Sequence, residues 1–293
     1  MELKAEQKSL PKIIRIITTS LAFGYSLGAC TLIGTISGII ISLIFSIFFL
    51  KEDTKPSPLA YFGVLLLLFF AGSTLNPHIC MVISAILLLL FEILFFRFEN
   101  LSEGAEYAGF MLASAFGVTA LVTNDYFGIG AEGSTVVEMI KSYVSFGFHP
   151  NWRGILYGTI VMVLMITIPR KFKKISKFVC PALIALIVIY VMNIFLIPKG
   201  TVSPISFVEN EILPGLPFDE RMPLSAPAVV LIVGGWQSVE WGKIARSFKS
   251  IKGAILFLLE FAVFTLTNPI IGVCLFAIIY ILCLILKKHQ KNN

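Results

Sequence analysis

Charged residues are scarce in this chain, and the polar surface that a soluble protein of its size needs is missing. Only 14% of the 293 residues are charged, 57% are hydrophobic, and the mean hydropathy is +0.90. A compact globule of this composition cannot cover its apolar surface with polar side chains. The sequence therefore predicts an all-α membrane protein without a separate soluble domain.

Motifs that carry chemistry are also missing. The three histidines lie at the edges of apolar runs or in the tail, and there is no HExxH, paired-aspartate or glycine-rich phosphate motif. The five cysteines, at 30, 80, 180, 274 and 283, lie in apolar runs without CxxC spacing, which indicates small buried side chains rather than a metal site or disulfides. We expect no enzymatic activity, no metal and no cofactor.

The most informative segment is a basic connector between two long apolar runs. Each run, 152–169 and 178–198, is long enough to cross a hydrocarbon core of about 30 Å. Because translocating a dense cationic loop is costly, we expect the connector on the cytoplasmic side. Its cations are Arg170, Lys171, Lys173, Lys174 and Lys177.

Hydropathy predicts about ten membrane spans with both chain ends in the cytoplasm. The N-terminus carries four cations and no small-residue cleavage site, so we interpret it as a retained cytoplasmic end. With this orientation every cytoplasmic gap holds cations, whereas the outside gaps hold no charge or mainly acids. The net charge of +6 follows from this bias and from contact with anionic lipid, so nucleic acid is not an expected partner. The expected spans are 12–29, 31–50, 58–75, 77–97, 105–123, 152–169, 176–198, 224–241, 252–267 and 269–287.

One outside segment, 134–146, has apolar residues at helical spacing. This pattern predicts a short amphipathic helix that lies on the membrane surface or packs against neighbouring spans.

Three acids lie in or beside the expected spans. Glu92 is five residues before Arg97 near a cytoplasmic end, and Glu240 is close enough to Lys243 for a local ion pair. Glu260 lies within the run AILFLLEFAVFT without a cation nearby in sequence, and a lone carboxylate inside a membrane costs about 2.5 kcal/mol or more. Both a functional role and a structural pairing fit Glu260.

Several segments resemble the SulP sulfate permease family of anion transporters. The run HPNWRGILYGTIVMVLMITIPRKFKKISKFVCPALIALIVIYVMN, 149–193, is similar to the family's sixth and seventh helices, including the basic connector. ILPGLPF at 212–218 and SAPAVVLIVGGWQSVEWGKIARSF at 225–248 resemble the link into the eighth helix and that helix itself. Glu92–Phe116 resembles the turn from the fourth helix into the fifth, and 22–29 and 57–66 stand where helices one and three would begin.

The resemblance implies a transporter of small anions, but the chain departs from the family plan. Members resemble one another in having two inverted repeats of seven helices, usually followed by a STAS domain. Here 261–286 resembles the last two helices and follows directly after the eighth, so helices nine to twelve and STAS are expected to be absent. Half of the family's substrate site would be lost with them.

The resemblance also points to site residues. Ser57 and Pro58 would open an interrupted helix whose free backbone N–H groups, from Leu59 onward, hold an anion, although an ordinary helix start fits these residues as well. Gln237 stands about halfway along the run 224–241, where the family usually has an acid, and is expected to face the bundle interior. An amide can hydrogen-bond an anion but cannot titrate, and bonding between helices is an equal alternative. Tyr25 could line the same cavity or simply pack, and Glu260 is the candidate coupling group.

The leading hypothesis is secondary transport of sulfate-like anions, bicarbonate or dicarboxylates by alternating access. The alternatives are a non-transporting membrane subunit of a SulP-type carrier and an unrelated ten-helix metabolite carrier. We expect one transmembrane domain, 1–287, with core-type helices in 12–97 and 224–248, gate-type helices in 105–198 and 252–287, and a cytoplasmic tail, 288–293. The expected partners are a small anion, the lipid bilayer, and a second copy or a partner chain.

Overall fold

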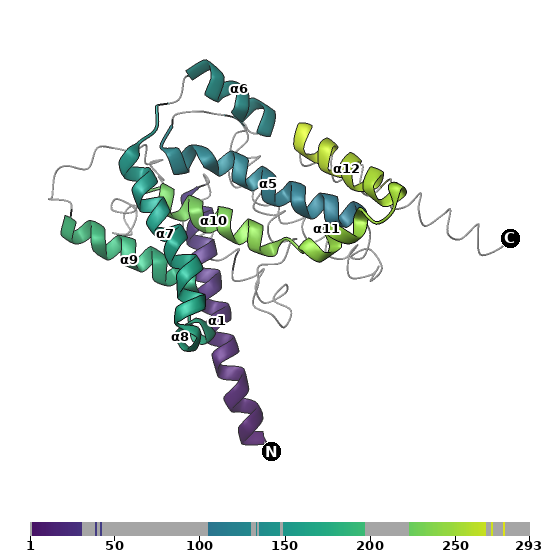
Figure 1. Cartoon of the computed structure of the whole chain (residues 1–293). Helices are drawn as coiled ribbons and strands as arrows, with labels where there is room; N and C mark the ends of the chain where they lie inside the picture. Colours follow the sequence, from purple (N-terminus) through teal and green to yellow (C-terminus); the bar gives the residue numbers. More distant parts are fainter. Residues whose placement is uncertain are drawn as a thin grey trace.

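A computed structural model describes residues 2–30, 39, 42, 105–129, 133, 135–146, 149–196, 223–267, 271 and 278. All regular secondary structure in these ranges is helical (Figure 1), as the sequence predicts. The helices are α1 (Glu2–Ala29), α5 (Ala105–Phe127), α6 (Val136–Phe146), α7 (Trp152–Lys171), α8 (Lys173–Phe178), α9 (Pro181–Leu196), α10 (Ser225–Ser238), α11 (Trp241–Ser247) and α12 (Ile251–Leu266).

Six of the expected spans fall on described helices. They correspond to α1, α5, α7, α9, α10 and α12. Two helices in the described ranges, α5 from Tyr107 and α7, are long and apolar enough to cross a membrane, and α1 from Ile13 and α9 up to Phe195 are apolar but shorter. The expected spans 31–50, 58–75, 77–97 and 269–287 lie outside the described residues, apart from isolated positions.

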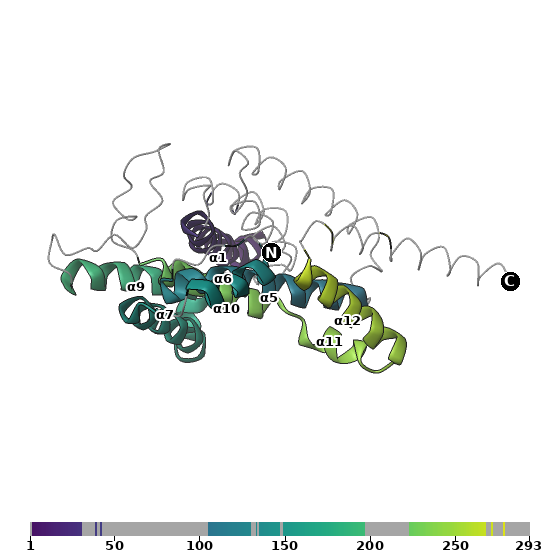
Figure 2. The same ribbon diagram turned by 90° about the horizontal axis from the view of Figure 1, so that it is seen from above.

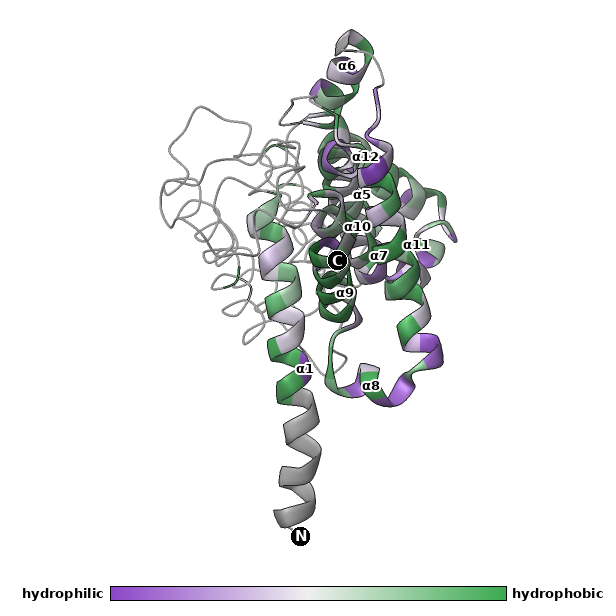
Figure 3. Cartoon of the chain, turned by 90° about the vertical axis from the view of Figure 1, so that its left-hand side faces the viewer, coloured by the Kyte–Doolittle hydropathy of each residue, from purple (hydrophilic) through white to green (hydrophobic). Residues whose placement is uncertain are grey.

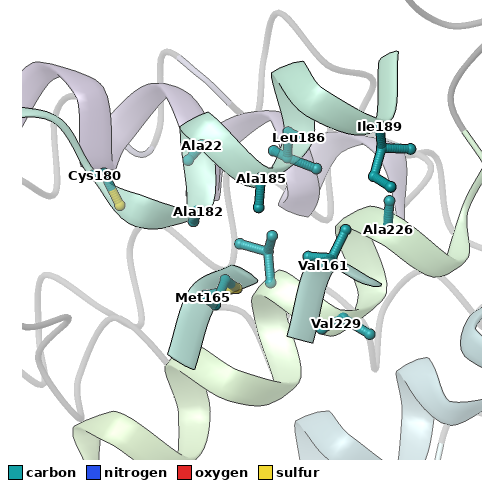
Figure 4. Close-up of a cluster of buried hydrophobic side chains, with 11 residues drawn as sticks. Ala22, Val161, Met165, Cys180, Ala182, Ala185, Leu186, Ile189, Ala226 and Val229 are labelled. Atoms are coloured by element: carbon teal, nitrogen blue, oxygen red, sulfur yellow. The ribbon is translucent and has the colours of Figure 1, made fainter. Parts of the chain in front are cut away.

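Four helices share one apolar core. Its side chains come from α1, α7, α9, the loop before α9, and α10 (Figure 4), and they are almost all alanine, valine, leucine or isoleucine. Seen from above, α1 and α7 lie on opposite sides of α9 and α10 (Figure 2). Cys180 is buried in this core, as predicted for the cysteines, and its backbone N–H donates to Thr18 Oγ1 on α1 (3.0 Å).

A second group of helices is organised around α5, which contacts both α10 and α12. The C-terminal end of α5 meets the start of α7, since the Asn151 N–H donates to Phe127 O (2.7 Å). The N-terminal end of α5 meets the end of α10, where the Glu240 N–H donates to Met111 Sδ (3.4 Å). The start of α10, at Ser225, lies beside Gly154 and Gly158 near the start of α7, so α10 runs opposite to α5, whereas α7 runs obliquely to both (Figure 1).

The start of α7 is fixed by a cap and by a close contact at Gly158. Asn151 Oδ1 accepts from the N–H groups of Arg153 (3.1 Å) and Gly154 (3.3 Å), so Asn151 is the N-cap of α7. A Cβ on Gly158 would lie 2.6 Å from the Tyr126 ring and 3.2 Å from Ser225 O. The missing side chain at Gly158 thus lets α7 approach α5 and α10 closely, whereas a Cβ on Gly154 would make only ordinary contacts, at 3.7 Å or more.

The expected amphipathic helix at 134–146 is α6. Thr135 Oγ1 accepts from the Glu138 N–H and the Glu138 carboxylate accepts from the Thr135 N–H, both at 3.2 Å, which is a reciprocal cap at its start. Val136 and Met139 are buried where α6 contacts α5 and α12, whereas the apolar face with Val144 stays exposed. The helix therefore both packs against the bundle and presents an apolar surface.

Candidate functional site

The helix that carries Gln237 is interrupted. α10 ends at Ser238, Val239 is extended (φ −70°, ψ 123°), and α11 begins at Trp241. Ser238 Oγ donates to Gly235 O (2.7 Å) and so satisfies one carbonyl of the last turn. Broken helices occur at membrane depth only where protein or an aqueous cavity surrounds the free backbone groups, and carriers build substrate sites from them.

The interruption is held against the N-terminal half of α5. Besides the contact of the Glu240 N–H with Met111, Lys243 Nζ lies 2.9 Å from the Glu240 carboxylate and 5.0 Å from the centroid of the Tyr107 ring. This is the ion pair predicted from the sequence. An exposed pair of this kind is worth about 0–1 kcal/mol, so the contacts with α5, not the pair itself, fix the position of the break.

Two indole rings stack across the break. The centroids of Trp236 and Trp241 are 6.0 Å apart, and their planes are inclined by 5°. Trp236 belongs to α10 and Trp241 to α11, so the stack sets the relative orientation of the two helices.

Gln237 lies in the last turn of α10 and its side chain is exposed. The sequence suggested a position halfway along a continuous span and facing the interior, but α10 ends one residue later. Carbonyl groups at a helix C-terminus carry partial negative charge, so an anion near Gln237 would depend on the amide N–H donors.

The other predicted substrate residues lie elsewhere. Tyr25, on α1, is half-buried and packs against the apolar core shared by α1, α7, α9 and α10, which is the packing role considered for it. Ser57, Pro58 and Leu59 are outside the described residues.

Glu260 is fully buried where α12 packs on α5. A Cβ added to Gly109 would lie 3.1 Å from Glu260 Cβ and only 2.6 Å from the backbone oxygen of Phe257. The missing side chain at Gly109 is therefore what allows α12 to bring its acid this close to the backbone of α5. The Phe110 and Phe264 rings meet edge-on beside it, with centroids 5.4 Å apart.

A polar cluster at the other end of α5 was not identified from the sequence. Asp125, in the last turn of α5, is hydrogen-bonded to the Cys30 thiol at the end of α1. Burial, together with the charge of Asp125, raises the pKa of Tyr143 on α6 to about 12. The sequence ended this span at residue 123 and assigned Asp125 to a loop, and the extension of α5 to Phe127 is what brings it to Cys30.

No group of three or more histidine, cysteine, aspartate or glutamate side chains in the described ranges could hold a metal ion. Comparisons with protein family models, with curated proteins and with solved structures found no match.

Proposed function

We propose that the chain is a multi-pass integral membrane protein of about ten spans with both ends in the cytoplasm. The support comes from helices that carry apolar side chains on their outward faces as well as inside. Helices that are apolar on all sides are typical of membrane spans, because a helix at a protein–water boundary is apolar on only one stripe. The exposed apolar residues recur at helical spacing and include Trp152, Leu156, Val163 and Ile166 on α7, Ile187, Val191, Ile194 and Phe195 on α9, and Ile251, Ile255, Leu258, Leu259 and Leu266 on α12.

The cations that follow the described helices support the same orientation. Arg170, Lys171, Lys173, Lys174 and Lys177 lie at the end of α7 and in α8, and Lys243, Arg246 and Lys249 lie after α10. Two helices, α9 and α10, separate the two groups, so both groups fall on one side of a membrane, the side that the positive-inside rule assigns to the cytoplasm.

Within this setting we infer that the chain carries small inorganic or carboxylate anions by alternating access, in the manner of the SulP family that its sequence resembles. The observation that carries this proposal is the interrupted helix α10–α11, held on α5 next to the contact between α5 and α12 that buries Glu260. Broken helices and buried ionisable residues inside a membrane are features of ion and substrate pathways.

A second candidate, a non-transporting subunit of a SulP-type carrier, is favoured by one observation. Gln237, at the position of the family's acid, is exposed at the C-terminal end of α10, where the helix dipole does not favour an anion. A partner chain would then supply the helices that this chain is expected to lack.

The test is uptake of labelled sulfate, bicarbonate and a dicarboxylate into proteoliposomes, alongside thermal unfolding of the purified protein with each anion. A carrier should show uptake and an anion-dependent rise in Tm, because a ligand that binds only the folded state stabilises it. The variant Gln237→Ala should lose both effects, whereas Lys249→Gln, an exposed change at the same end of the bundle, should keep both. Absence of uptake and of any Tm shift in the parent protein would support the subunit instead.

A further inference from the structure

The cations near the α10–α11 break are partly engaged. Lys243 pairs with Glu240, and Arg246 Nε donates to Gly242 O (3.2 Å). The basic connector between α7 and α9 is different: Arg170, Lys171, Lys173, Lys174 and Lys177 are all exposed, and none takes part in the ion pair found in the described ranges. Five cations within eight residues therefore face the surroundings together.

The same connector exposes three large apolar side chains. Phe172, Ile175 and Phe178 recur every third residue and are each about half exposed, at 54%, 49% and 47%. At about 100° per residue, Ile175 and Phe178 fall on one side of α8, and the three lysines of α8 fall on the other. A segment with one apolar and one cationic side suits the boundary between acyl chains and headgroups.

The fold holds this segment at one end of the bundle. α8 contacts α7 and α1. Figure 3 shows its hydrophilic and hydrophobic residues beyond the ends of α7 and α9, next to α1. The apolar residues and the cations belong to the same short segment. If the apolar side chains enter a leaflet, the cations therefore lie at the depth of its headgroups.

We propose that Phe172–Phe178, with Arg170 and Lys171, is a binding site for anionic phospholipid headgroups. The cations attract the headgroup phosphates, and the apolar side chains insert beside the acyl chains. Each cation near an anionic membrane surface contributes about 1 kcal/mol, which corresponds to roughly a fivefold change in affinity. This site rests on the membrane placement proposed above but not on transport, so it can be tested in a protein that carries nothing.

The experiment is native mass spectrometry of the purified full chain, which measures retention of phosphatidylglycerol against phosphatidylcholine. We expect preferential retention of phosphatidylglycerol, and a loss of roughly tenfold or more in the double variant Lys173→Gln/Lys174→Gln. The matched control Lys249→Gln/Lys252→Gln removes the same charge from exposed positions at the α11–α12 junction and should retain the lipid as the parent does. Far-UV circular dichroism and gel filtration establish that both variants are folded.

Two further measurements test the lipid site in the parent protein, without the double variants. In the parent protein, added salt should reduce retention of phosphatidylglycerol but not of phosphatidylcholine, because only the former depends on charge. Inorganic phosphate and glycerol phosphate should fail to displace the lipid at concentrations matched to it, since they lack acyl chains. Equal retention of the two lipids, equal loss in both double variants, or displacement by free phosphate would overturn the assignment.

Discussion

Substituting Gly109 by alanine tests the close approach of α12 to α5. The new Cβ would lie 2.6 Å from Phe257 O, a backbone atom, and reaching the ordinary contact distance of 3.4 Å requires the helices to separate by about 0.8 Å. Overpacking of this kind costs about 1–3 kcal/mol, and the better helix propensity of alanine returns about 1 kcal/mol. We therefore expect Gly109→Ala to be less stable than the parent by up to about 2 kcal/mol, which for a chain of 293 residues is a Tm lower by up to about 3 °C.

The matched control is Gly242→Ala on α11, where no atom lies within 4 Å of the new Cβ. Here only the helix propensity acts, so stability should rise by up to about 1 kcal/mol. Thermal unfolding of both variants in the same detergent, with the parent alongside, gives the comparison. If Gly109→Ala is as stable as Gly242→Ala, α5 and α12 do not pack as closely as described, and the enclosure of Glu260 between them is wrong.

Three further predictions concern orientation and titration. Single cysteines placed at Lys173 and Lys249 in a cysteine-free background should react with a membrane-impermeant maleimide only from the cytoplasmic side, and labelling of position 173 from outside would contradict the proposed topology. Glu260→Gln should fold, because the amide keeps the shape of the side chain, and in a transporting protein it should change the pH dependence of anion flux; loss of assembly would instead identify a structural contact. Because the pKa of Tyr143 is raised from 10 to about 12, the folded protein loses stability as the pH rises from 10 to 12, and Tyr143→Phe should make that loss smaller in thermal unfolding measured across this range.

The sequence predicts helices well where an apolar run is bounded by local signals. Asn151 caps the span that begins at Trp152, and Arg170 and Lys171 lie in its last turn. The predicted start at 152 is therefore correct, and the predicted end at 169 is two residues short of the observed end. The break in α10–α11 was not predicted, because the run from Val229 to Trp241 has no proline at that point and its glycines lie within the helix. What holds the break is a contact of the Glu240 N–H with Met111, 129 residues away in sequence, and local pattern carries no information about such a partner.

At the candidate site, too, features set by the local sequence could be predicted, and features set by contacts between distant helices could not. Glu260 could be singled out because a carboxylate inside an apolar run is costly wherever the neighbouring helices lie, and it is fully buried in the structure. The exposure of Gln237 could not be predicted, because it follows from the end of α10 at Ser238. The partnership of Asp125 with Cys30 depends on how α1 and α5 meet, which no spacing within either helix encodes.

The stacked indoles of Trp236 and Trp241 make the break optically visible. Two parallel aromatic chromophores at 6.0 Å couple their electronic transitions, and the coupling depends steeply on their separation and relative angle. Of the three tryptophans in the chain, the third, Trp152, lies at the opposite end of the bundle, so it adds a background signal without joining the pair. Any motion that bends α11 away from α10 would part the two rings and change the exciton band of the circular dichroism spectrum. The native protein thus carries its own label for following this joint in real time.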